Sequence, residues 1–498
     1  PNRSAFSPDG KMLACTGDKL TLWDVATGKE ILKSSGHRDA VQDVICSPDG
    51  RLLISRANDN SVRVWNLKTG EEVKRFRSDN LWYGGRLSIA PKGHLSWCDS
   101  RTVRTVELQS LHEKNPQKLC WPLSAITTST DRRWVIGFSH LDGVLVWNRE
   151  SMCLHRELKS KYPGWKISLS PDGAYLALLT GDVEIVSCKS WKKVRQIQNV
   201  YENRGGDGEV LSTLWLPISS FAWSPQSNQI LTTCERFRRA RLRALEGKKT
   251  IVTFENCTAT AFLNSFSPTG RMVVLNGDDA LELWEVATGL LRARWRGHEG
   301  GIASICFTPD GRKLITGGFD STILIRDLYP PEKSNRSLDS LWELLADDAQ
   351  KSFRAMCQMM HRKKDTLSSL AKNMMPTPKL SYQAIMSWTN QLDSAHLAIR
   401  TKARERLEEL DQSAEPVLRK MLTQRPTLTL RRRILTLLAR LKWVSWKRAR
   451  PLRAIEILEQ LGTNQSRKLL RRLATGGVSE TARQAKLALM RMEKVGEE

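Results

Sequence analysis

A short turn motif recurs eight times along the first two thirds of this chain of 498 residues. Four copies combine a proline with an aspartate and a glycine, and most intervals between the copies are about 40–45 residues. The eight segments are Phe6–Gly10, Cys46–Gly50, Ile89–Gly93, Ser129–Asp131, Leu169–Gly173, Trp223–Gln226, Phe266–Gly270 and Phe307–Gly311. A repeat of this length is typical of β-propellers, in which each unit folds into one four-stranded blade.

The residues around each turn predict short strands. The runs Val41–Cys46, Leu52–Ser55 and Val62–Trp65 are rich in β-branched residues and are bounded by Pro, Gly, Asp or Asn. Such boundaries are typical of strands joined by tight turns. A proline after the first strand cannot donate a ladder hydrogen bond, so it ends that strand. We therefore predict an all-β array over residues 1–328.

The third strand of several units ends in a recognisable tripeptide. These endings are Leu22–Asp24, Val64–Asn66, Val146–Asn148, Leu283–Glu285 and Ile325–Asp327. Together with Gly36-His37 and Gly297-His298, they resemble WD40 repeats, and the resemblance covers residues 1–328. It implies a closed propeller. The eight turns predict eight blades, with seven as the alternative if the sixth unit is an insertion within the ring.

In the WD40 family a His–Ser/Thr–Asp–Trp hydrogen-bond network cross-links a blade. By resemblance, the complete set here is His37, Ser55, Asp59 and Trp65. The last repeat keeps His298, Thr316 and Asp320, but Arg326 replaces the tryptophan. A buried network stabilises a fold only when all its members are paired, so we expect the other blades to depend on packing.

Three units depart from the repeat pattern. The positions of their tripeptides hold Val106–Leu108, Val186-Ser187 and Arg243-Ala244, and an insertion around Glu202–Gly208 lengthens one interval. The blade boundaries near residues 180–250 are therefore open. Within the insertion, we interpret Gly205–Gly208 as a loop, because no Lys-Ser/Thr pair opens a helix after it.

The ends of the repeat array are incomplete by the family pattern. Pro1 falls directly before a first strand, and the last unit ends at its third strand, Ile323–Leu328. In the family, the missing outer strand comes from upstream of the first blade. We therefore expect the chain to be a fragment of a longer polypeptide.

The pattern changes after residue 328. Residues 329–336 are predicted to be a linker, and residues 337–498 a helical domain, because the apolar period becomes 3.6. Leu430, Ile434, Leu437, Leu438 and Leu441 form one apolar stripe. Helices are predicted near 337–360, 381–392, 396–411, 414–424, 427–442, 450–461, 465–475 and 479–493. The short connections predict a HEAT-like array or a helical bundle.

This helical part also has a family likeness. Segments including Leu341–Ala349, Phe353–Met356, Ala414–Arg419 and Leu452–Thr463 resemble a region that follows WD40 propellers in large bacterial multidomain proteins. The resemblance implies no defined activity for the region.

Positive charge is concentrated in the helical part. The formal net charge of the chain is +25, and residues 331–498 hold 33 Lys and Arg against 18 Asp and Glu. No Asp or Glu occurs between Pro416 and Ile455, where Trp443 and Trp446 lie among basic residues. The candidate basic patch is Arg419, Lys420, Arg425, Arg431, Arg432, Arg433, Arg440, Lys442, Lys447, Arg448 and Arg450. Such residues bind nucleic acid, an acidic protein or a lipid surface, or form a solvated helix face.

Catalytic and cofactor motifs are missing from the sequence. No Walker loop, GxGxxG, HExxH, GxSxG or kinase catalytic-loop pattern occurs, and no His or Cys spacing fits a metal site. We predict no catalytic, cofactor-binding or metal-ligating residue. The ten cysteines are interpreted as buried, reduced thiols, which favours a cytoplasmic location. The sequence has no run of 18 apolar residues, so it predicts no membrane span.

These features predict a non-catalytic protein-interaction scaffold. A rigid propeller offers loops for a protein or peptide partner, and the helical domain adds a second, basic surface. Two alternatives stay open. One is a nucleic-acid-associated protein that uses residues 416–455, and the other is an accessory region of a longer regulatory protein or enzyme whose N-terminal part is absent.

Overall fold

The computed structural model describes most of the chain. It covers residues 3–494 except 8–10, 17–19, 29–35, 79–85, 91–92, 100–101, 115, 119–122, 124, 130–132, 140–142, 149–152, 159–165, 205–209, 235–237, 247–249, 258–262, 278–279, 377–381, 410–413, 425, 442–445 and 477–478. The chain divides into two compact units. The first comprises residues 1–284 and 294–328, and the second comprises 285–293 and 329–498.

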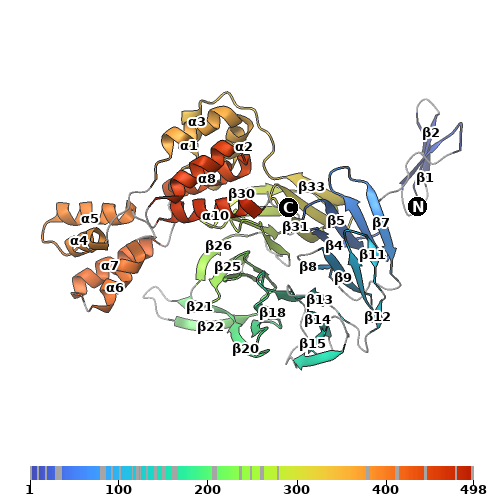
Figure 1. Cartoon of the computed structure of the whole chain (residues 1–498), viewed down its shortest axis with the longest axis horizontal. Helices are drawn as coiled ribbons and strands as arrows, with labels where there is room; N and C mark the ends of the chain where they lie inside the picture. Colours follow the sequence, from blue (N-terminus) through green and yellow to red (C-terminus); the bar gives the residue numbers. More distant parts are fainter. Residues whose placement is uncertain are drawn as a thin grey trace. The chain divides into compact units, whose positions relative to one another are not determined.

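Seven antiparallel sheets follow one another around a ring in the first unit (Figure 1). The first sheet contains β4 (Val41–Cys46), β5 (Leu52–Ala57), β6 (Ser61–Asn66) and β7 (Glu72–Arg77). The second contains β8 (Ser88–Ala90), β9 (His94–Asp99) and β10 (Thr102–Glu107), with β11 (His112–Glu113) and β12 (Gln117–Lys118). The third contains β13 (Ala125–Thr128), β14 (Trp134–Ser139), β15 (Gly143–Asn148) and β16 (Leu154–Leu158).

The other four sheets repeat the same up-and-down order. The fourth sheet contains β17 (Lys166–Leu169), β18 (Tyr175–Leu179), β19 (Val183–Ser187) and β20 (Lys193–Ile197), and the fifth contains β23 (Ser220–Trp223), β24 (Gln229–Cys234), β25 (Arg239–Ala244) and β26 (Thr250–Phe254). The sixth contains β27 (Asn264–Phe266), β28 (Met272–Asn276), β29 (Leu281–Glu285) and β30 (Leu290–Trp295). The seventh contains β31 (Ile302–Phe307), β32 (Lys313–Gly318) and β33 (Ile323–Asp327).

The ring closes where the last of these sheets meets the first. Strand β31 packs directly against β4, and Ile315 joins the buried cluster that holds Val41 and Trp65. The Sγ atoms of Cys46 and Cys306 lie 3.8 Å apart across this closure. The expectation of eight blades is therefore wrong, and the propeller has seven. No eighth sheet can enter between β31 and β4, because each already buries the face of the other.

The miscount has a specific source. The first turn motif, at Phe6, belongs to a separate three-stranded sheet formed by β1 (Arg3–Phe6), β2 (Met12–Thr16) and β3 (Leu20–Asp24). The sixth unit is not an insertion, because it folds into the complete sheet β23–β26. The third and fifth units also form sheets despite their altered tripeptides. The lengthened interval holds a hairpin of β21 (Asn199–Arg204) and β22 (Val210–Leu216), and Gly205–Gly208 lies outside the described residues.

The turn motif has a packing role between neighbouring blades. Gly50 has a φ of +70°, in the left-handed region that glycine adopts without strain, and a Cβ there would lie 3.5 Å from Pro309 Cδ. Gly311 meets Pro268 of the preceding blade in the same way, at 3.6 Å. The glycine of one turn thus packs on the proline of its neighbour, which explains why the two residue types recur together.

The second unit contains ten helices in its described residues. They are α1 (Leu338–Leu344), α2 (Ala349–His361), α3 (Lys363–Asn373), α4 (Tyr382–Gln391), α5 (Leu397–Glu409), α6 (Glu415–Thr423), α7 (Leu428–Leu441), α8 (Trp446–Leu461), α9 (Asn464–Ala474) and α10 (Glu480–Lys494). The single helix predicted over 337–360 is wrong. Asp348 accepts hydrogen bonds from the backbone N–H groups of Gln350 and Lys351, so it begins α2 as a separate helix.

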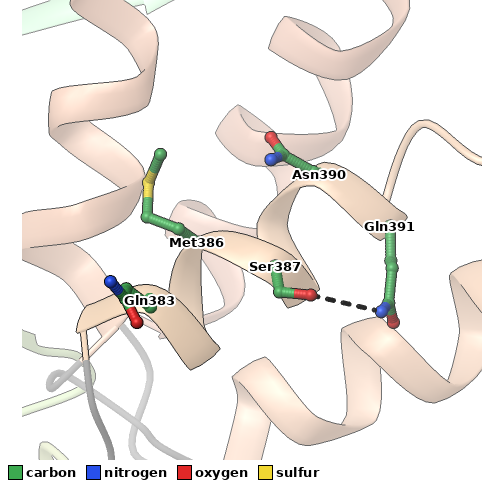
Figure 2. A pocket seen from close by; sticks show the side chains of 5 residues that line it. All are labelled: Gln383, Met386, Ser387, Asn390 and Gln391. Carbon is green, nitrogen blue, oxygen red and sulfur yellow. Dashed lines mark hydrogen bonds between the residues drawn. The ribbon is translucent and has the colours of Figure 1, made fainter.

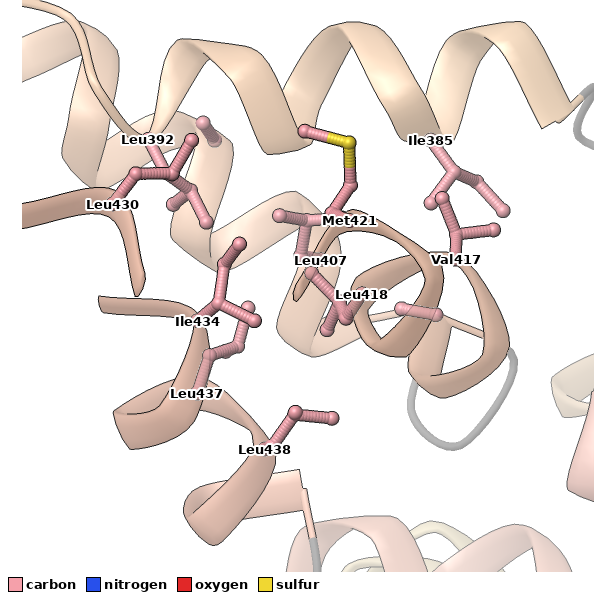
Figure 3. Packing of buried hydrophobic residues seen from close by; sticks show 12 residues of the cluster. Ile385, Leu392, Leu407, Val417, Leu418, Met421, Leu430, Ile434, Leu437 and Leu438 are labelled. Atoms are coloured by element: carbon pink, nitrogen blue, oxygen red, sulfur yellow. The ribbon is translucent and has the colours of Figure 1, made fainter. Parts of the chain in front are cut away.

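The helices pack in two groups within this unit. Helices α4–α7 share a core of aliphatic side chains, among them Ile385, Leu407, Leu418, Ile434 and Leu437 (Figure 3). Helices α2 and α3 instead pack against α8, although more than 70 residues separate them from it in sequence. Repeats of a solenoid contact only their neighbours. This pattern of contacts is that of a bundle.

Candidate functional sites

The four network residues of the first blade lie together in the structure. His37 Nδ1 is 3.0 Å from Asp59 Oδ2, and His37 Nε2 is 2.7 Å from Ser55 Oγ. Trp65 Nε1 donates to the same Ser55 Oγ at 2.7 Å. The His37 side chain is fully buried. The chain of hydrogen bonds therefore ties the segment before β4 to strands β5 and β6.

A buried arginine that the sequence reasoning missed extends this network. The Arg63 side chain is only 2% exposed, and it donates to Asp59 at 3.1 Å and to Glu72 at 2.9 Å. Glu72 also accepts from Arg75, at 2.8 Å. A period of two places Arg63 on the same face of β6 as Ser61 and Trp65. That alternation was the available signal for a charged residue within the network.

The carboxyl group of Asp59 is held in its ionised form. Burial raises its pKa, but hydrogen bonds from His37 and Ser61 and the charge of His37 outweigh burial and hold the pKa well below its usual range. Ionised Asp59 then orients both the imidazole ring and the Arg63 guanidinium. The network therefore stabilises the blade and offers no free acid or base for catalysis.

The last blade holds a partial network. His298 Nδ1 is 3.0 Å from Asp320 Oδ1, and His298 Nε2 is 2.8 Å from Thr316 Oγ1. A Cβ at Gly318 would collide with the His298 ring, which explains the glycine there. Arg326 does not replace the tryptophan in this network. Its Nη2 donates to the Arg296 carbonyl at 3.1 Å, and its guanidinium lies 5.3 Å from the centre of the Trp295 ring.

Replacement of Arg326 by tryptophan is expected to stabilise the last blade by about 1 kcal/mol, because an indole N–H would reach Thr316. Urea unfolding of the full chain measures the change in the free energy of unfolding. Arg326→Phe is the matched control, since it supplies the ring without the N–H. Equal stability of the two variants would show that the network cannot be completed in this blade.

The basic patch predicted between Pro416 and Ile455 is only partly described. Arg419 and Lys420 on α6 and Arg431 and Arg432 on α7 are exposed. Two other members have structural contacts. Arg433 Nη1 donates to the Leu392 carbonyl at 2.6 Å, and Arg450 Nη2 donates to Glu343 Oε2 at 2.6 Å. The side chains of the remaining predicted members lie outside the described residues, namely Arg425, Arg440, Lys442, Lys447 and Arg448.

The second unit contains a buried cluster of four charged side chains that the sequence reasoning did not assemble. Arg453 donates to both carboxyl oxygens of Glu285, at 3.0 and 2.7 Å, and also to the backbone carbonyls of Leu345 and Asp347. Arg292 bridges the two acids, at 2.6 Å from Glu285 and at 2.8 and 2.9 Å from Glu456. These four side chains are each no more than 3% exposed. The cluster therefore joins the segment 285–293 to α8.

The surroundings of this cluster fix its charge state. Burial raises the pKa of Glu285, but the charge of Arg292 and a hydrogen bond from Arg453 lower the pKa to about 2. Tyr329 donates its hydroxyl to Glu456 Oε1 at 2.6 Å, and the Arg292 guanidinium lies 5.5 Å from the centre of the Phe353 ring. Two acids and two arginines balance each other, so the cluster acts as a structural tie.

Cavities lined by described residues occur in both units. One is an open depression of about 650 Å³ on α4, lined by Gln383, Met386, Ser387, Asn390 and Gln391 (Figure 2). Its lining is uncharged and combines polar side chains with Met386, and Gln391 Nε2 lies 3.5 Å from Ser387 Oγ. The other, of about 450 Å³, lies in the propeller between the third and fourth sheets, beside Trp134, Tyr175 and Trp191. Neither combines an activated nucleophile with a base.

The cysteines differ in burial. All eight that the structure describes are free thiols; Cys98, Cys234, Cys257 and Cys357 are buried, whereas Cys153 is exposed. The interpretation of the cysteines as buried is therefore wrong for Cys153. Burial raises the pKa of Cys98 to about 12, so this thiol stays protonated at neutral pH.

Metal and membrane sites were sought over the same residues. Within the described ranges, no three His, Cys, Asp or Glu side chains gather in a way that could hold a metal ion. No helix in the described part of the chain is both long and apolar enough to cross a membrane.

The ring, the blade network and sequence comparison agree on the class of protein. Residues 28–66 and 289–327 match the family model described as WD domain, G-beta repeat. These ranges contain the two blade networks around His37 and His298. The chain is therefore a WD-repeat β-propeller followed by a C-terminal helical region.

Three relatives illustrate what the chain is similar to. Intraflagellar transport protein 122 homolog of Danio rerio is 23% identical over 419 residues, which cover 80% of this chain and 30% of the relative. Target of rapamycin complex subunit wat1 of Schizosaccharomyces pombe is 28% identical over 202 residues, covering 37% and 62%. Eukaryotic translation initiation factor 3 subunit I of Aspergillus oryzae is 27% identical over 357 residues, covering 66% and 92%. The match thus spans less than two thirds of the first two relatives.

Proposed function

We propose that this protein is a non-catalytic scaffold that binds a protein or peptide on a face of its propeller. The observation that carries the proposal is the closed seven-bladed ring, stiffened at its closure by the His37 network. Loops on a rigid scaffold are suited to recognition. Two of the relatives are named as subunits of a complex or factor, which supports a role in an assembly.

The carboxyl groups of the two buried networks support a structural role rather than a catalytic one. Asp59 and Glu285 are both held ionised by close hydrogen bonds and nearby positive charge. A general acid or base needs a pKa near the working pH, and these groups are shifted away from it. The free thiols support a reducing, cytoplasmic location for the protein.

Native mass measurement combined with affinity capture tests the scaffold proposal. The full chain, expressed in its source cells, is expected to migrate as part of a larger complex, and the captured partner is expected to bind the purified chain directly. A Trp65→Ala variant, which weakens the first blade, is expected to lose that partner. A chain that migrates alone at native concentrations would contradict the proposal.

A second candidate function is binding of nucleic acid through the helical region. The observation in its favour is that Arg419, Lys420, Arg431 and Arg432 are exposed on α6 and α7, in a stretch without acidic residues. Lysine and arginine side chains neutralise phosphates and release counterions, so binding of this kind weakens steeply with salt.

Charge reversal at Arg431 and Arg432 tests this candidate. The double change to glutamate is expected to weaken binding of labelled single-stranded RNA or DNA by at least tenfold and to flatten its salt dependence, as measured by fluorescence anisotropy of the full chain. Arg433 is left unchanged because it bonds to the Leu392 carbonyl. Lys468→Glu/Arg471→Glu is the control, since these two exposed residues lie on α9, outside the patch. An equal loss in both variants would indicate a non-specific charge effect.

We also propose that the helical region is of the kind that follows propellers in large bacterial multidomain proteins. The resembling segment Leu341–Ala349 spans α1 and the start of α2, and Leu452–Thr463 spans most of α8. Both segments supply residues that hold the second unit together, since Arg453 Nη1 donates a hydrogen bond to the Leu345 carbonyl. The sequence of the complete gene would test this proposal. Neighbouring regions unlike those of large bacterial multidomain proteins would contradict it.

A further inference from the structure

A group of charged side chains gathers where the first strands of the blades meet. The first strands β4, β8, β13, β17, β23, β27 and β31 are the innermost of their sheets: several of them pack against one another around the ring. Propeller blades surround a central channel, which such strands line. Asp43 lies on β4, Lys166 lies on β17, and Arg86 lies just before β8. Three separate blades therefore contribute charge to one place.

Lys166 is held at this place by neutral groups. Its Nζ donates to the Phe221 carbonyl at 2.7 Å and to Ser220 Oγ at 3.1 Å, and it lies 5.2 Å from the centre of the Phe221 ring. Among the described residues, no carboxylate forms an ion pair with Lys166. An ammonium group has three N–H donors. Two of them are used by β23, and the third is available to a ligand.

Asp43 only partly balances the positive charge. It accepts a hydrogen bond from the Leu87 backbone N–H at 2.7 Å, and it lies opposite Arg56 in the register of β4 and β5. Burial raises the pKa of Asp43, and the charges of Arg86 and Arg56 oppose that rise; the charge of Arg86 also acts on Lys166. Among the described groups, Asp43 is the one carboxyl group whose charge opposes that of Arg86 at Lys166. Arg86 is exposed, so a group entering the channel can reach it.

We propose that Arg86 and Lys166, beside Asp43 in the channel, bind a carboxylate that an acidic peptide of a partner protein inserts into the propeller. The inference rests on the scaffold function and gives the partner its chemistry. Arg86 supplies a planar fork that matches a carboxylate, and Lys166 supplies one further donor. Burial lowers the local dielectric around Lys166, which strengthens its contact with a carboxylate.

The protonation of Lys166 gives the site a measurable property. Burial, with the charge of Arg86, lowers the pKa of Lys166 to about 7, and Asp43 opposes that shift. The groups that face Lys166 from the packed elements are Arg86 and Asp43, with only the neutral Ser220 and Phe221 on β23. A carboxylate binds the charged ammonium better, so affinity is highest below pH 7. The affinity falls by about tenfold between pH 7 and pH 8.5, because Lys166 must then take up a proton on binding.

Three blocked peptides test the proposal on the full chain by isothermal titration calorimetry. The first carries an internal glutamate with both termini capped, the second carries glutamine with a free C-terminal carboxylate, and the third carries glutamine with a C-terminal amide. Binding of the first or second identifies a side-chain or a terminal carboxylate as the ligand. Binding of all three alike, or of none, would overturn the proposal.

Substitutions locate the site. Lys166→Met is expected to reduce affinity by at least tenfold and to abolish the fall above pH 7, and Lys166→Arg is expected to restore binding without that fall. Lys193→Met is the matched control, because Lys193 lies on β20 of the same blade and is exposed. Arg86→Gln provides a second variant at an exposed position, where folding is less affected. Unchanged peptide affinity in both site variants would contradict the proposal. If Lys166→Met still captures its partner in cells, only the channel site fails and the scaffold function stands.

Discussion

Replacement of Arg453 by alanine is expected to lower the free energy of unfolding of the helical unit by about 3–5 kcal/mol. Arg453 is 1% exposed and donates to both oxygens of Glu285, so its loss leaves that carboxylate with Arg292 as its remaining cation. Two backbone carbonyls, of Leu345 and Asp347, lose a donor in the same change. Breaking one side of a buried charge network costs more than the network contributes as a whole.

Urea unfolding followed by the helical circular dichroism signal measures the effect, and hydrogen exchange of α8 locates it. Arg450→Ala is the control. Arg450 lies on the same helix and pairs with Glu343, but Glu343 is 69% exposed, so the loss is expected to stay below about 1 kcal/mol. A similar small loss for Arg453→Ala would contradict the assignment of the cluster as a structural tie.

The pH dependence of stability checks the same cluster. Glu285 has a pKa of about 2 in the folded chain, against an ordinary value of 4.5. Its stabilising contribution is therefore complete above about pH 4.5 and is lost as the pH falls towards 2. In Arg453→Ala the pKa of Glu285 is expected to rise towards its ordinary value. The variant is therefore expected to be less stable at neutral pH and to lose less stability than the parent chain as the pH falls.

Replacement of Trp65 by alanine is expected to cost about 3–5 kcal/mol, as a large-to-small change in a core. Trp65 packs with Val41, Leu53 and Ile315 at the ring closure, and its Nε1 donates to Ser55. The lost side chain leaves a cavity at the closure and removes one donor from the buried network. The cost arises from both effects, because the cavity and the unpaired oxygen occur at one place.

Thermal and urea unfolding of the full chain measure this change. Trp65→Phe separates its two parts, since the ring mostly fills the site and only the N–H is removed, with an expected cost of about 1–2 kcal/mol. Thermal unfolding that is unchanged in Trp65→Ala would refute the role of Trp65 in the closure. Equal losses for the alanine and phenylalanine variants would assign the whole effect to the hydrogen bond.

The blades illustrate what a single sequence can predict. The turn motif predicts each blade because local residues suffice: proline ends a strand and glycine takes the left-handed turn, as at Gly50. The pairing of His37 with Asp59 was predicted from the resemblance to WD40 repeats. Blade number does not follow from these local rules, since the first motif lies on β1 and looks like the others. The closure depends on β31 meeting β4, which are more than 250 residues apart.

The helical region shows the same limit more strongly. Apolar periodicity predicts most helices, yet it runs through the break between α1 and α2, where Leu341, Leu345 and Ala349 keep a spacing of four. Helix α3 was not predicted, since its apolar positions are few. The basic stretch was predicted as one patch. Its described members differ in the structure: Arg431 is exposed, Arg433 donates to a carbonyl, and Arg450 pairs with Glu343.

By itself, the sequence determined that this chain forms repeated four-stranded units followed by helices, because turn residues and apolar periods act over a few residues. The resemblance to WD40 repeats also predicted the network of His37, Ser55, Asp59 and Trp65. Only the tertiary structure decided the seven-bladed closure, the burial of Arg63 and the cluster of Glu285, Arg292, Arg453 and Glu456. The reason is that burial and charge pairing depend on which distant segments pack together, and no local pattern encodes that.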